Sequence, residues 1–390
     1  MLREKGRKKI SSNTIQSIEK IELVHSGEEF FIRLVDIISK SQTEIHFQTY
    51  IFDNDATGKM IADALKAAAS RHVKIYVLLD GYGSAALSDA FINDLSQQDI
   101  NIRFFSPFFS TNNFYLGRRL HHKVVVVDSH IALIGGINIA DKYKGTPTKT
   151  PWLDYAVYIE GRALAEHLQQ ICENIYFKEN PISLKITNPV FHLPNQDIVR
   201  IIQNDWLKQK SEISKAYIKA IRNAKSEVII VGSYFLPGRK LTRALKTAAV
   251  RGVKIKLILS GISDVPFAKR ATSYLYSSFL KRQIELYEWH NSVLHGKVAL
   301  VDNKWVTVGS FNLNYLSSYG SIEMNVAVNS LEFAKTLAVH LQHVMAQCEN
   351  ITVEKLKKQK GIFQRIMNWF SYHFVRISLI MLTYMSYKRL

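Results

Sequence analysis

One polar pattern occurs twice in this chain, once in each half. Residues 121–138 read HHKVVVVDSHIALIGGIN, and residues 295–312 read HGKVALVDNKWVTVGSFN. Each copy begins with a histidine, has a lysine two positions later and an aspartate further on, and ends with an asparagine, all at the same relative positions. Because four polar residue types recur in register, we infer an internal duplication, whose period is far too long for a solenoid repeat.

Each copy of the pattern predicts two β-strands joined by a turn. Residues two apart on a strand point to the same face, so each histidine should share a face with its lysine. The apolar runs VVVV and VALV are typical of strands buried on both faces. Asp128 and Asp302 then fall in the turns, and the small residues at 135–136 and 309–310 let backbone approach a ligand closely.

The duplication extends well beyond this pattern. ALKAAASRHVKIYVLLDG at 64–81 and ALKTAAVRGVKIKLILSG at 244–261 are the same helix-and-strand element. The alternation of helices and strands predicts an α/β fold with an open, mostly parallel sheet and helices on both faces. The predicted helices are 28–40, 60–72, 211–225 and 241–252, and the predicted strands are 44–52, 73–81, 101–108, 226–235, 253–261 and 283–289.

Composition limits the partners and excludes several classes of protein. The chain has 51 Lys and Arg against 33 Asp and Glu, a net charge of +18, which predicts a polyanionic partner such as nucleic acid or an anionic membrane surface. The only cysteines are Cys172 and Cys348, and with no CxxC spacing they argue against a disulfide framework and a structural zinc site. We also expect neither a secretory signal nor a membrane-spanning helix, because no apolar stretch is long enough.

The C-terminal segment differs from the rest of the chain. A basic run, KLKKQKG at 355–361, precedes a stretch in which apolar and aromatic residues fall at helical spacing up to Leu390. Two interpretations stay open: the helix packs on the second repeat, or it is an interfacial amphipathic helix. Trp369, with arginine and lysine nearby, favours the interfacial helix.

The doubled pattern resembles the HxKxxxxD signature of the phospholipase D superfamily, and both copies match it in full. The resemblance implies two homologous phospholipase D-like α/β/α sandwich domains, related by a pseudo-twofold axis, with both motifs meeting in one cleft. We expect a basic flexible N-terminus at 1–20, domain 1 at 21–185, domain 2 at 186–350, and a basic, amphipathic membrane-associating tail at 351–390.

Two histidines on opposite sides of a phosphodiester supply a complete reaction. One imidazole attacks phosphorus, and the other protonates the leaving alkoxide; the resemblance favours His121 as nucleophile and His295 as acid. Two lysines can supply the positive charge, so no metal or other cofactor is expected. The catalytic candidates are His121, Lys123, Asp128, His295, Lys297 and Asp302, and the phosphate-binding or supporting candidates are Asn138, Asn312, Ser310, Asp154 and Glu323.

Carboxylates in the two repeats have different expected roles. Asp154 and Glu323 each follow the histidine of their own repeat, in the matching segments DYAVYIEG and EMNVAVNS, and are expected to fix the imidazole tautomers; the alternative is a surface carboxylate. Asp128 and Asp302 are expected to anchor the motif loops rather than to touch phosphorus. His122 should point to the opposite face of the strand from His121 and serve the structure.

The repeats also differ at one position of the motif. The first copy has Gly136 where the second has Ser310, so one hydroxyl is missing. From this difference we expect the two halves to bind phosphate unequally.

Within the superfamily, residues 25–58, 216–241 and 309–318 resemble bacterial cardiolipin synthases, in particular their short form without N-terminal transmembrane helices. The resemblance implies transfer of a phosphatidyl group to phosphatidylglycerol through a covalent phosphohistidine, with phosphatidylglycerol or phosphatidylethanolamine as donor. It also implies a peripheral enzyme on the cytoplasmic face of the inner membrane, with an anionic phospholipid membrane and no nucleic acid as partner. The alternatives are a phospholipase D-type phosphodiesterase or nuclease of the same fold, and a catalytically idle lipid-binding scaffold.

Overall fold

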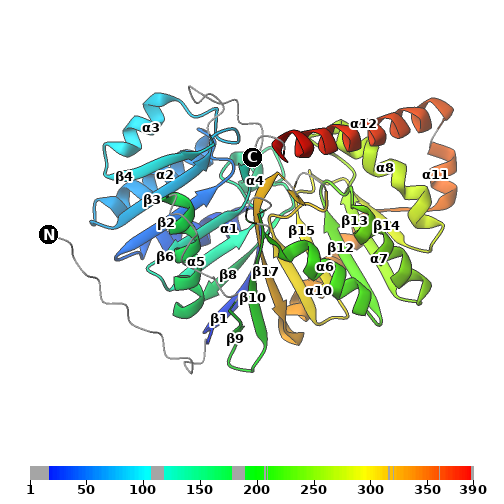
Figure 1. The fold of residues 1–390 in the computed structure, drawn as a ribbon. Helices are drawn as coiled ribbons and strands as arrows, with labels where there is room; N and C mark the ends of the chain where they lie inside the picture. Colours follow the sequence, from blue (N-terminus) through cyan, green and yellow to red (C-terminus); the bar gives the residue numbers. More distant parts are fainter. Residues whose placement is uncertain are drawn as a thin grey trace.

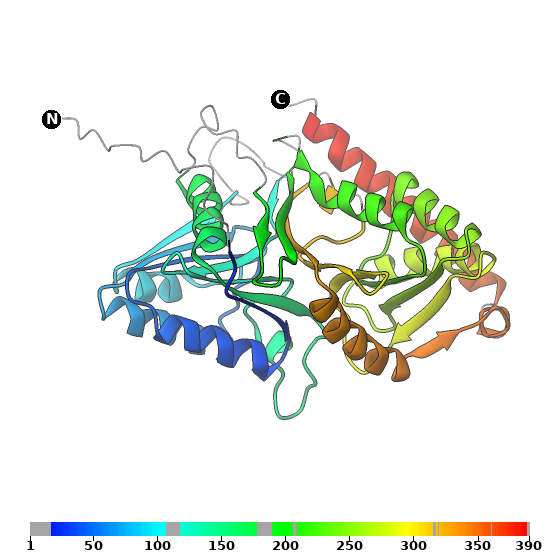
Figure 2. The same cartoon turned by 90° about the horizontal axis from the view of Figure 1, so that it is seen from below.

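Two β-sheets with helices packed on them form the body of the molecule (Figure 1), and Figure 2 shows the same arrangement from below. The architecture is described here from a computed structural model. The described residues are 17–106, 118–177, 189–205, 208, 210–314, 317–318, 320–359 and 361–387.

The first sheet is built from the first repeat. Among the described residues it has seven strands, in the spatial order β1 (Lys20–His25), β8 (Tyr155–Glu160), β7 (Ile131–Gly135), β6 (Lys123–Val127), β2 (Glu44–Thr49), β3 (Lys74–Asp80) and β4 (Ile100–Phe105).

The second sheet repeats this order with strands of the second repeat. Its main path is β11 (Lys210–Ser211), β10 (Ile198–Asp205), β17 (Ser321–Asn329), β16 (Trp305–Gly309), β15 (Lys297–Val301), β12 (Glu227–Gly232), β13 (Lys254–Ser260), β14 (Glu285–Trp289) and β18 (Glu349–Ile351). Two short strands pair with this path: β5 (Arg119–Leu120) with β17, and β9 (Phe191–His192) with β10.

The prediction of mostly parallel sheets is wrong. In each sheet three strands run parallel, β2–β3–β4 and β12–β13–β14, and the other described neighbours on the main paths run antiparallel. The reason lies in the motif itself, because its two strands are joined by a tight turn and can pair only as an antiparallel hairpin.

Helices cover both faces of each sheet, as predicted. In the first sheet α1 and α2 bury their apolar faces on one side and α5 on the other; in the second, α6, α7 and α8 lie opposite α10. The helices are α1 (Glu28–Ser39), α2 (Ala56–Ala69), α3 (Asp89–Ser96), α4 (Asp141–Lys144), α5 (Arg162–Tyr176), α6 (Glu212–Asn223), α7 (Arg239–Val250), α8 (Pro266–Leu280), α10 (Leu331–Ala346), α11 (Val353–Gln359) and α12 (Ile362–Tyr387).

The two repeats share a core and meet in a reciprocal way. One hydrophobic cluster contains side chains from α5 and α10 together with strands of both sheets. β8 packs against β16, and its counterpart β17 packs against β7. This exchange of equivalent contacts is the pattern of a twofold interface, and it confirms the predicted pseudo-twofold arrangement.

Part of the predicted domain division lies outside the described residues. The proposed boundary at 185/186 falls in the segment 178–188, and most of the predicted flexible N-terminus lies in 1–16. Of the remainder, Ser17 forms a β-bridge with His192, and β1 already begins at Lys20.

The turns after β6 and β15 are held by their aspartates, as predicted. Asp128 has φ 52° and accepts hydrogen bonds from the backbone N–H groups of residues 42–44, at 2.7–3.0 Å. Asp302 has the same φ and accepts from the N–H groups of residues 225–227, at 2.8–3.0 Å. Each carboxylate therefore ties the motif hairpin to the start of the neighbouring strand, and these hydrogen bonds hold the pKa of both groups below the usual range.

The tail packs on the second repeat, which is one of the two interpretations that the sequence left open; the interfacial helix stays a prediction. α12 lies across α8 (Figure 1), and Tyr372 stacks on Tyr274 of α8 with ring centroids 4.7 Å apart. Apolar residues at helical spacing stay largely exposed: Phe363, Phe370 and Phe374 are each more than half exposed, although Phe374 also lies beside Phe267 of α8, with ring centroids 6.3 Å apart. No helix among the described residues is long and apolar enough to cross a membrane.

We predict that Asp128→Ala and Asp302→Ala each destabilise the fold. Each substitution leaves three backbone N–H groups without their acceptor, which should lower the free energy of unfolding by about 1–3 kcal/mol. Urea unfolding followed by circular dichroism measures the loss. Asp→Asn at the same positions keeps one acceptor oxygen and should cost less; alanine variants as stable as the wild type would contradict the anchoring role.

Candidate active site

A crossed strand pairing brings the first motif to the second domain. β5 lies directly before His121 and pairs in parallel with β17. The backbone N–H of His121 donates to the carbonyl of Ile322, 3.0 Å away. Glu323 follows in β17 and is fully buried, and its Oε2 lies 2.9 Å from Nδ1 of His121. The first histidine therefore takes its carboxylate from the second repeat.

The second motif is placed in the reciprocal way. The backbone N–H groups of His295 and Gly296 both donate to the carbonyl of Leu153, at 2.8 and 2.9 Å. The next residue, Asp154, is fully buried and holds Nδ1 of His295 at 2.6 Å with its Oδ2. The prediction that these carboxylates orient imidazoles is supported by this geometry, but the expected pairing within each repeat is wrong, because both pairs cross between the domains.

Both motif lysines are buried beside their histidines. Nζ of Lys123 donates to the carbonyl of His121 at 2.5 Å, and Nζ of Lys297 donates to the carbonyl of His295. β6 and β15 begin at these lysines, so each histidine stands just before its strand rather than within it. Burial lowers the pKa of Lys123 to about 7 and that of Lys297 to about 8.

The charges of the two motifs act on one another. Burial lowers the pKa of His295 well below its usual range, and Lys297 and Lys123 lower it further. Burial also lowers the pKa of His121; Glu323 opposes this shift, and Lys123 and Lys297 add to it. Geometry brings the two motifs together as well, because Asp154 lies against Gly136 of the first motif and holds His295 of the second. Burial raises the pKa of Asp154 to about 6, against the effect of the lysines.

Gly136 and Ser310 occupy equivalent positions in the two motifs, and each lies against one of the buried carboxylates. A Cβ at Gly136 would lie 2.4 Å from Oδ1 of Asp154, so only glycine leaves room for that carboxylate. Ser310, at the equivalent position, donates its hydroxyl to Oε2 of Glu323 at 2.5 Å. Asp154, the shorter acid, therefore packs against the backbone of Gly136, whereas Glu323, the longer acid, accepts a hydrogen bond from Ser310. The hydroxyl of Ser310 is engaged with Glu323.

The two asparagines contact neighbouring protein groups. Asn138 is buried; its Oδ1 accepts from the N–H of Ile51 at 3.0 Å, and its Nδ2 donates to the hydroxyl of Tyr143 at 2.7 Å. Oδ1 of Asn312 accepts from the hydroxyl of Ser233 at 2.8 Å. These contacts tie the end of each motif to the loop after β2 or β12, so the asparagines at least position the site. Direct contact with phosphate stays a prediction.

The remaining candidates lie away from the histidine–carboxylate pairs. Asp128 and Asp302 occupy the far ends of β6 and β15, where they hold turns. His122 is fully buried, and its Nε2 contacts Oε1 of Gln48 on β2 at 2.8 Å, which supports the structural role predicted for it.

Aromatic side chains around the histidines were missed by the sequence analysis. Tyr50 contacts His121 edge-on, with ring centroids 4.9 Å apart. Tyr143, Trp152 and Tyr234 lie around His295, with centroids 5.3, 5.8 and 6.4 Å from its ring. The sequence did contain a signal for two of them. Tyr50 and Tyr234 follow the ends of β2 and β12 by one and two residues, and these strands pair with the motif strands.

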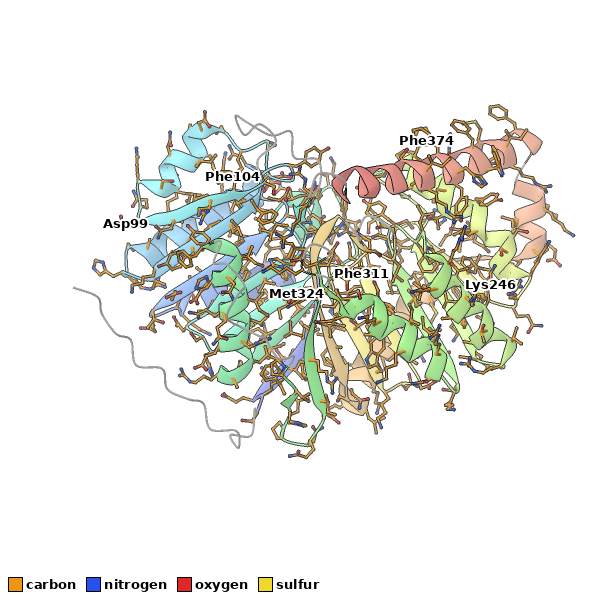
Figure 3. The ribbon with its side chains drawn as sticks, in the orientation of Figure 1. Asp99, Phe104, Lys246, Phe311, Met324 and Phe374 are labelled. Carbon is orange, nitrogen blue, oxygen red and sulfur yellow. The ribbon has the colours of Figure 1, made fainter. Side chains whose placement is uncertain are left out.

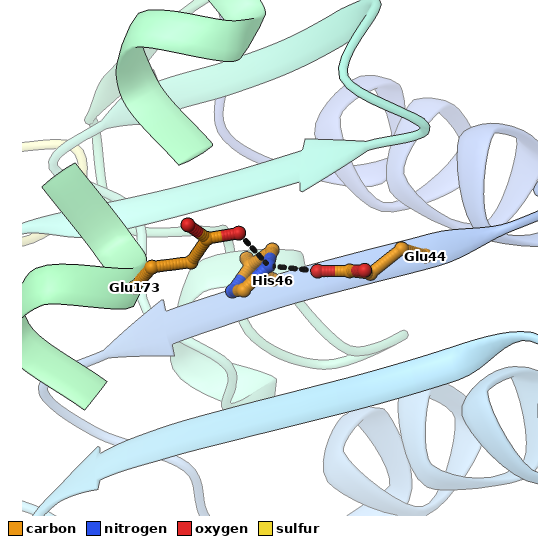
Figure 4. A group of neighbouring side chains, drawn as sticks. All are labelled: Glu44, His46 and Glu173. Carbon is orange, nitrogen blue, oxygen red and sulfur yellow. Dashed lines mark hydrogen bonds and ion pairs between the residues drawn. The ribbon is translucent and has the colours of Figure 1, made fainter. Parts of the chain in front are cut away.

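A separate cluster of titratable groups joins β2 and α5 (Figure 4). Nε2 of His46 contacts the carboxylate of Glu44 and lies 3.7 Å from that of Glu173. Nε2 of Gln169 donates to both carboxylates, at 3.3 and 3.0 Å. The cluster is thus held together by its own hydrogen bonds and ion pairs, and none of its residues belongs to the motifs.

Comparison with known proteins identifies the family. The family model described as "Cardiolipin synthase, PLD-like domain" matches residues 34–176 and 217–345. Cardiolipin synthase B of Escherichia coli (strain K12) is 34% identical over 370 residues, which cover 92% of this chain and 88% of the relative. Cardiolipin synthase B of Salmonella typhimurium is 34% identical over 371 residues, with the same coverage.

A solved structure shares the fold. The crystal structure of phosphatidylserine synthase from Haemophilus influenzae Rd KW20 superposes with a TM-score of 0.73 at 16% identity, covering 93% of this chain and 95% of that one. The family match spans both repeats and includes the two histidine–lysine motifs. The chain therefore belongs to the cardiolipin synthase family of phospholipase D-like proteins.

Proposed function

We propose that this protein is a phosphatidyltransferase that makes cardiolipin, passing a phosphatidyl group to a hydroxyl of phosphatidylglycerol through a covalent phosphohistidine. One observation carries the proposal: two histidines, each held by a buried carboxylate from the opposite repeat, share a site with two buried lysines. Phosphatidylglycerol, or phosphatidylethanolamine, is the donor in this proposal.

The first step forms the intermediate. The carboxylate of Glu323 holds Nδ1 of His121, so Nε2 carries the lone pair that attacks phosphorus. The bond from phosphorus to the donor headgroup oxygen breaks, and His295 gives that oxygen a proton. Lys123 and Lys297 stabilise the charge that gathers on the non-bridging oxygens. One phosphorus–nitrogen bond replaces one phosphorus–oxygen bond, and the headgroup alcohol leaves.

The second step reverses these roles. His295, now neutral, takes the proton from a hydroxyl of phosphatidylglycerol, and that oxygen attacks the phosphohistidine. The phosphorus–nitrogen bond breaks, His121 is restored, and cardiolipin leaves. The same chemistry with water would give phosphatidic acid, so the balance between transfer and hydrolysis depends on which nucleophile reaches the site.

The substrate's own charge makes His295 a usable acid. In the free protein burial and the two lysines hold the pKa of His295 well below its usual range, so the ring is neutral near pH 7. A bound phosphodiester brings one negative charge beside the lysines and offsets their effect on the ring. Protonation of His295 is therefore coupled to substrate binding.

The exposed face of α12 favours a lipid over a nucleic acid as substrate. Phe370, Phe374 and Ile377 are each more than half exposed along one side of this helix, and Trp369 lies beside them, half exposed. Exposed apolar side chains on a helix in a basic protein suit the boundary between headgroups and acyl chains. We propose peripheral association with an anionic membrane through this face, on the cytoplasmic side of the inner membrane.

The function predicts a product. Purified protein mixed with phosphatidylglycerol vesicles should yield cardiolipin and glycerol in equal amounts, and adding phosphatidylethanolamine tests the second donor. Mass spectrometry of the lipids measures the outcome, and flotation of the same vesicles measures association. Release of phosphatidic acid without cardiolipin would make the protein a phosphodiesterase, and cleavage of single-stranded DNA with no lipid product would make it a nuclease.

The roles of the two histidines predict different kinetics with an activated donor. A p-nitrophenyl phosphodiester needs no general acid for its leaving group, so His295→Ala should release about one equivalent of nitrophenol per protein and then stall. His121→Ala should give no burst. Stopped-flow absorbance measures the burst, and mass spectrometry of the stalled protein locates the phosphate. A burst from His121→Ala alone would reverse the assignment, and wild-type turnover in either variant would refute the shared site.

The buried lysines predict an unusual pH profile. Because the pKa of Lys123 lies at about 7 and that of Lys297 at about 8, both lose their charge as the pH rises through this range. kcat/KM, which reports the free enzyme, should therefore fall above pH 7–8, well below the range of an ordinary lysine. The fall in kcat should lie at higher pH, because bound phosphate stabilises the charged amines. A kcat/KM that stays constant to pH 10 would contradict this explanation.

A further inference from the structure

A cavity separate from the histidine site lies between α7, α8 and α12. Its volume is about 580 Å³, and no residue of either motif is among those that line it. Arg239, Arg243 and Lys246 enter it from α7, Arg282 from the loop after α8, and Arg376 from α12. The cavity therefore gathers five cationic side chains from three elements.

These five cations lack anionic partners among the described residues. Within that part of the chain, none of them forms an ion pair with a carboxylate, and no Asp or Glu lines the cavity. Lys246 donates to the hydroxyl of Ser278 at 2.8 Å, and Arg376 to the hydroxyl of Tyr372 at 3.3 Å, both uncharged. Burial and the charge of Arg282 lower the pKa of Lys246, which fits an uncompensated cluster.

The walls of the cavity are apolar between these charges. Arg239, Arg243 and Lys246 recur at helical spacing along one face of α7, and Val250 continues that face. Leu275 of α8 lies opposite. The cavity therefore offers cations that can bind a phosphate and, beside them, apolar surface that can contact hydrocarbon. A free inorganic anion would use only the cations.

The position of the cavity points to the source of such a ligand. α12 supplies Tyr372 and Arg376 to the cavity, while Phe374 and Ile377 of the same helix are more than half exposed. Figure 3 shows Phe374 on the side of α12 that faces away from the sheet, with Lys246 on α7. A membrane that receives the apolar face of α12 would therefore present its headgroups close to the cavity.

We propose that this cavity binds the headgroup phosphate of an anionic phospholipid, at a site distinct from the catalytic histidines. The bound lipid holds the second domain against the membrane and supplements the apolar contact of α12. The proposal relies on the proposed function only for the choice of a phospholipid as ligand.

The test removes two charges from the cavity in the full-length protein. Arg243→Gln with Lys246→Gln is compared with a control variant, Lys254→Gln with Lys335→Gln. The control removes two exposed charges, one at the start of β13 and one on α10, which lies across the sheet from α7. Binding to vesicles of phosphatidylglycerol in phosphatidylcholine, at physiological salt, should weaken by about tenfold or more in the cavity variant and by less than about threefold in the control. Equal losses in both variants would overturn the proposal.

A second measurement distinguishes a lipid site from a general anion site. In the His121→Ala background, which blocks turnover, monomeric dihexanoyl phosphatidylglycerol titrated by calorimetry should bind at two sites per chain with the cavity intact and at one site in the cavity variant. Inorganic phosphate should compete only weakly. One lipid site in both proteins, or phosphate binding as tightly as the lipid, would overturn the assignment. Because neither measurement uses turnover, their failure is distinct from a failure to form cardiolipin.

Discussion

The site depends on two buried positive charges. Burying Lys123 and Lys297 is costly, and burial alone moves the pKa of each toward neutrality. Asp154 and Glu323 offset part of this cost, because they supply negative charge at the same depth. Each carboxylate is hydrogen-bonded to a histidine, whereas the lysine amines donate to uncharged backbone carbonyls. In the proposed reaction, these amines are the charged groups that meet the phosphodiester. Preorganised charge of this kind acts without reorganisation during the reaction.

The two repeats place a carboxylate beside a histidine with different residues. An aspartate is one methylene shorter than a glutamate, yet both carboxylates reach Nδ1 of a histidine, at 2.6 and 2.9 Å. The shorter acid is accommodated by Gly136, where any Cβ would collide with it, and the longer acid is held by the hydroxyl of Ser310. The sequence difference that suggested unequal phosphate binding is therefore a compensation for the length of the acid.

Much of this arrangement could be predicted from the sequence, and the rest depends on contacts between distant segments. Spacing within each motif predicted the hairpins and the anchoring turns at Asp128 and Asp302, because those are local. The prediction of mostly parallel strands was wrong, since the order of strands along the chain does not determine whether neighbours pair parallel or antiparallel. The crossed carboxylates could not be found from spacing, because the separation of an acid from a histidine along the chain does not tell which of the two histidines it meets. In α12 the apolar periodicity was right, but polar and aromatic residues such as Tyr372 make the contact with α8.

The crossed pairs also bear on how such a chain arose. A protein with a single motif would contain one catalytic histidine, and its acid would hydrogen-bond to the histidine of another copy. Such a protein would be active only as a symmetric dimer. If two such copies are joined in one gene, the histidine–carboxylate contacts that linked two molecules become contacts between two domains of one chain. After that fusion, selection can alter one acid and its neighbour, as at Asp154 and Gly136, without repeating the change in the other half. A joined chain is free of the symmetry that a pair of identical copies must obey.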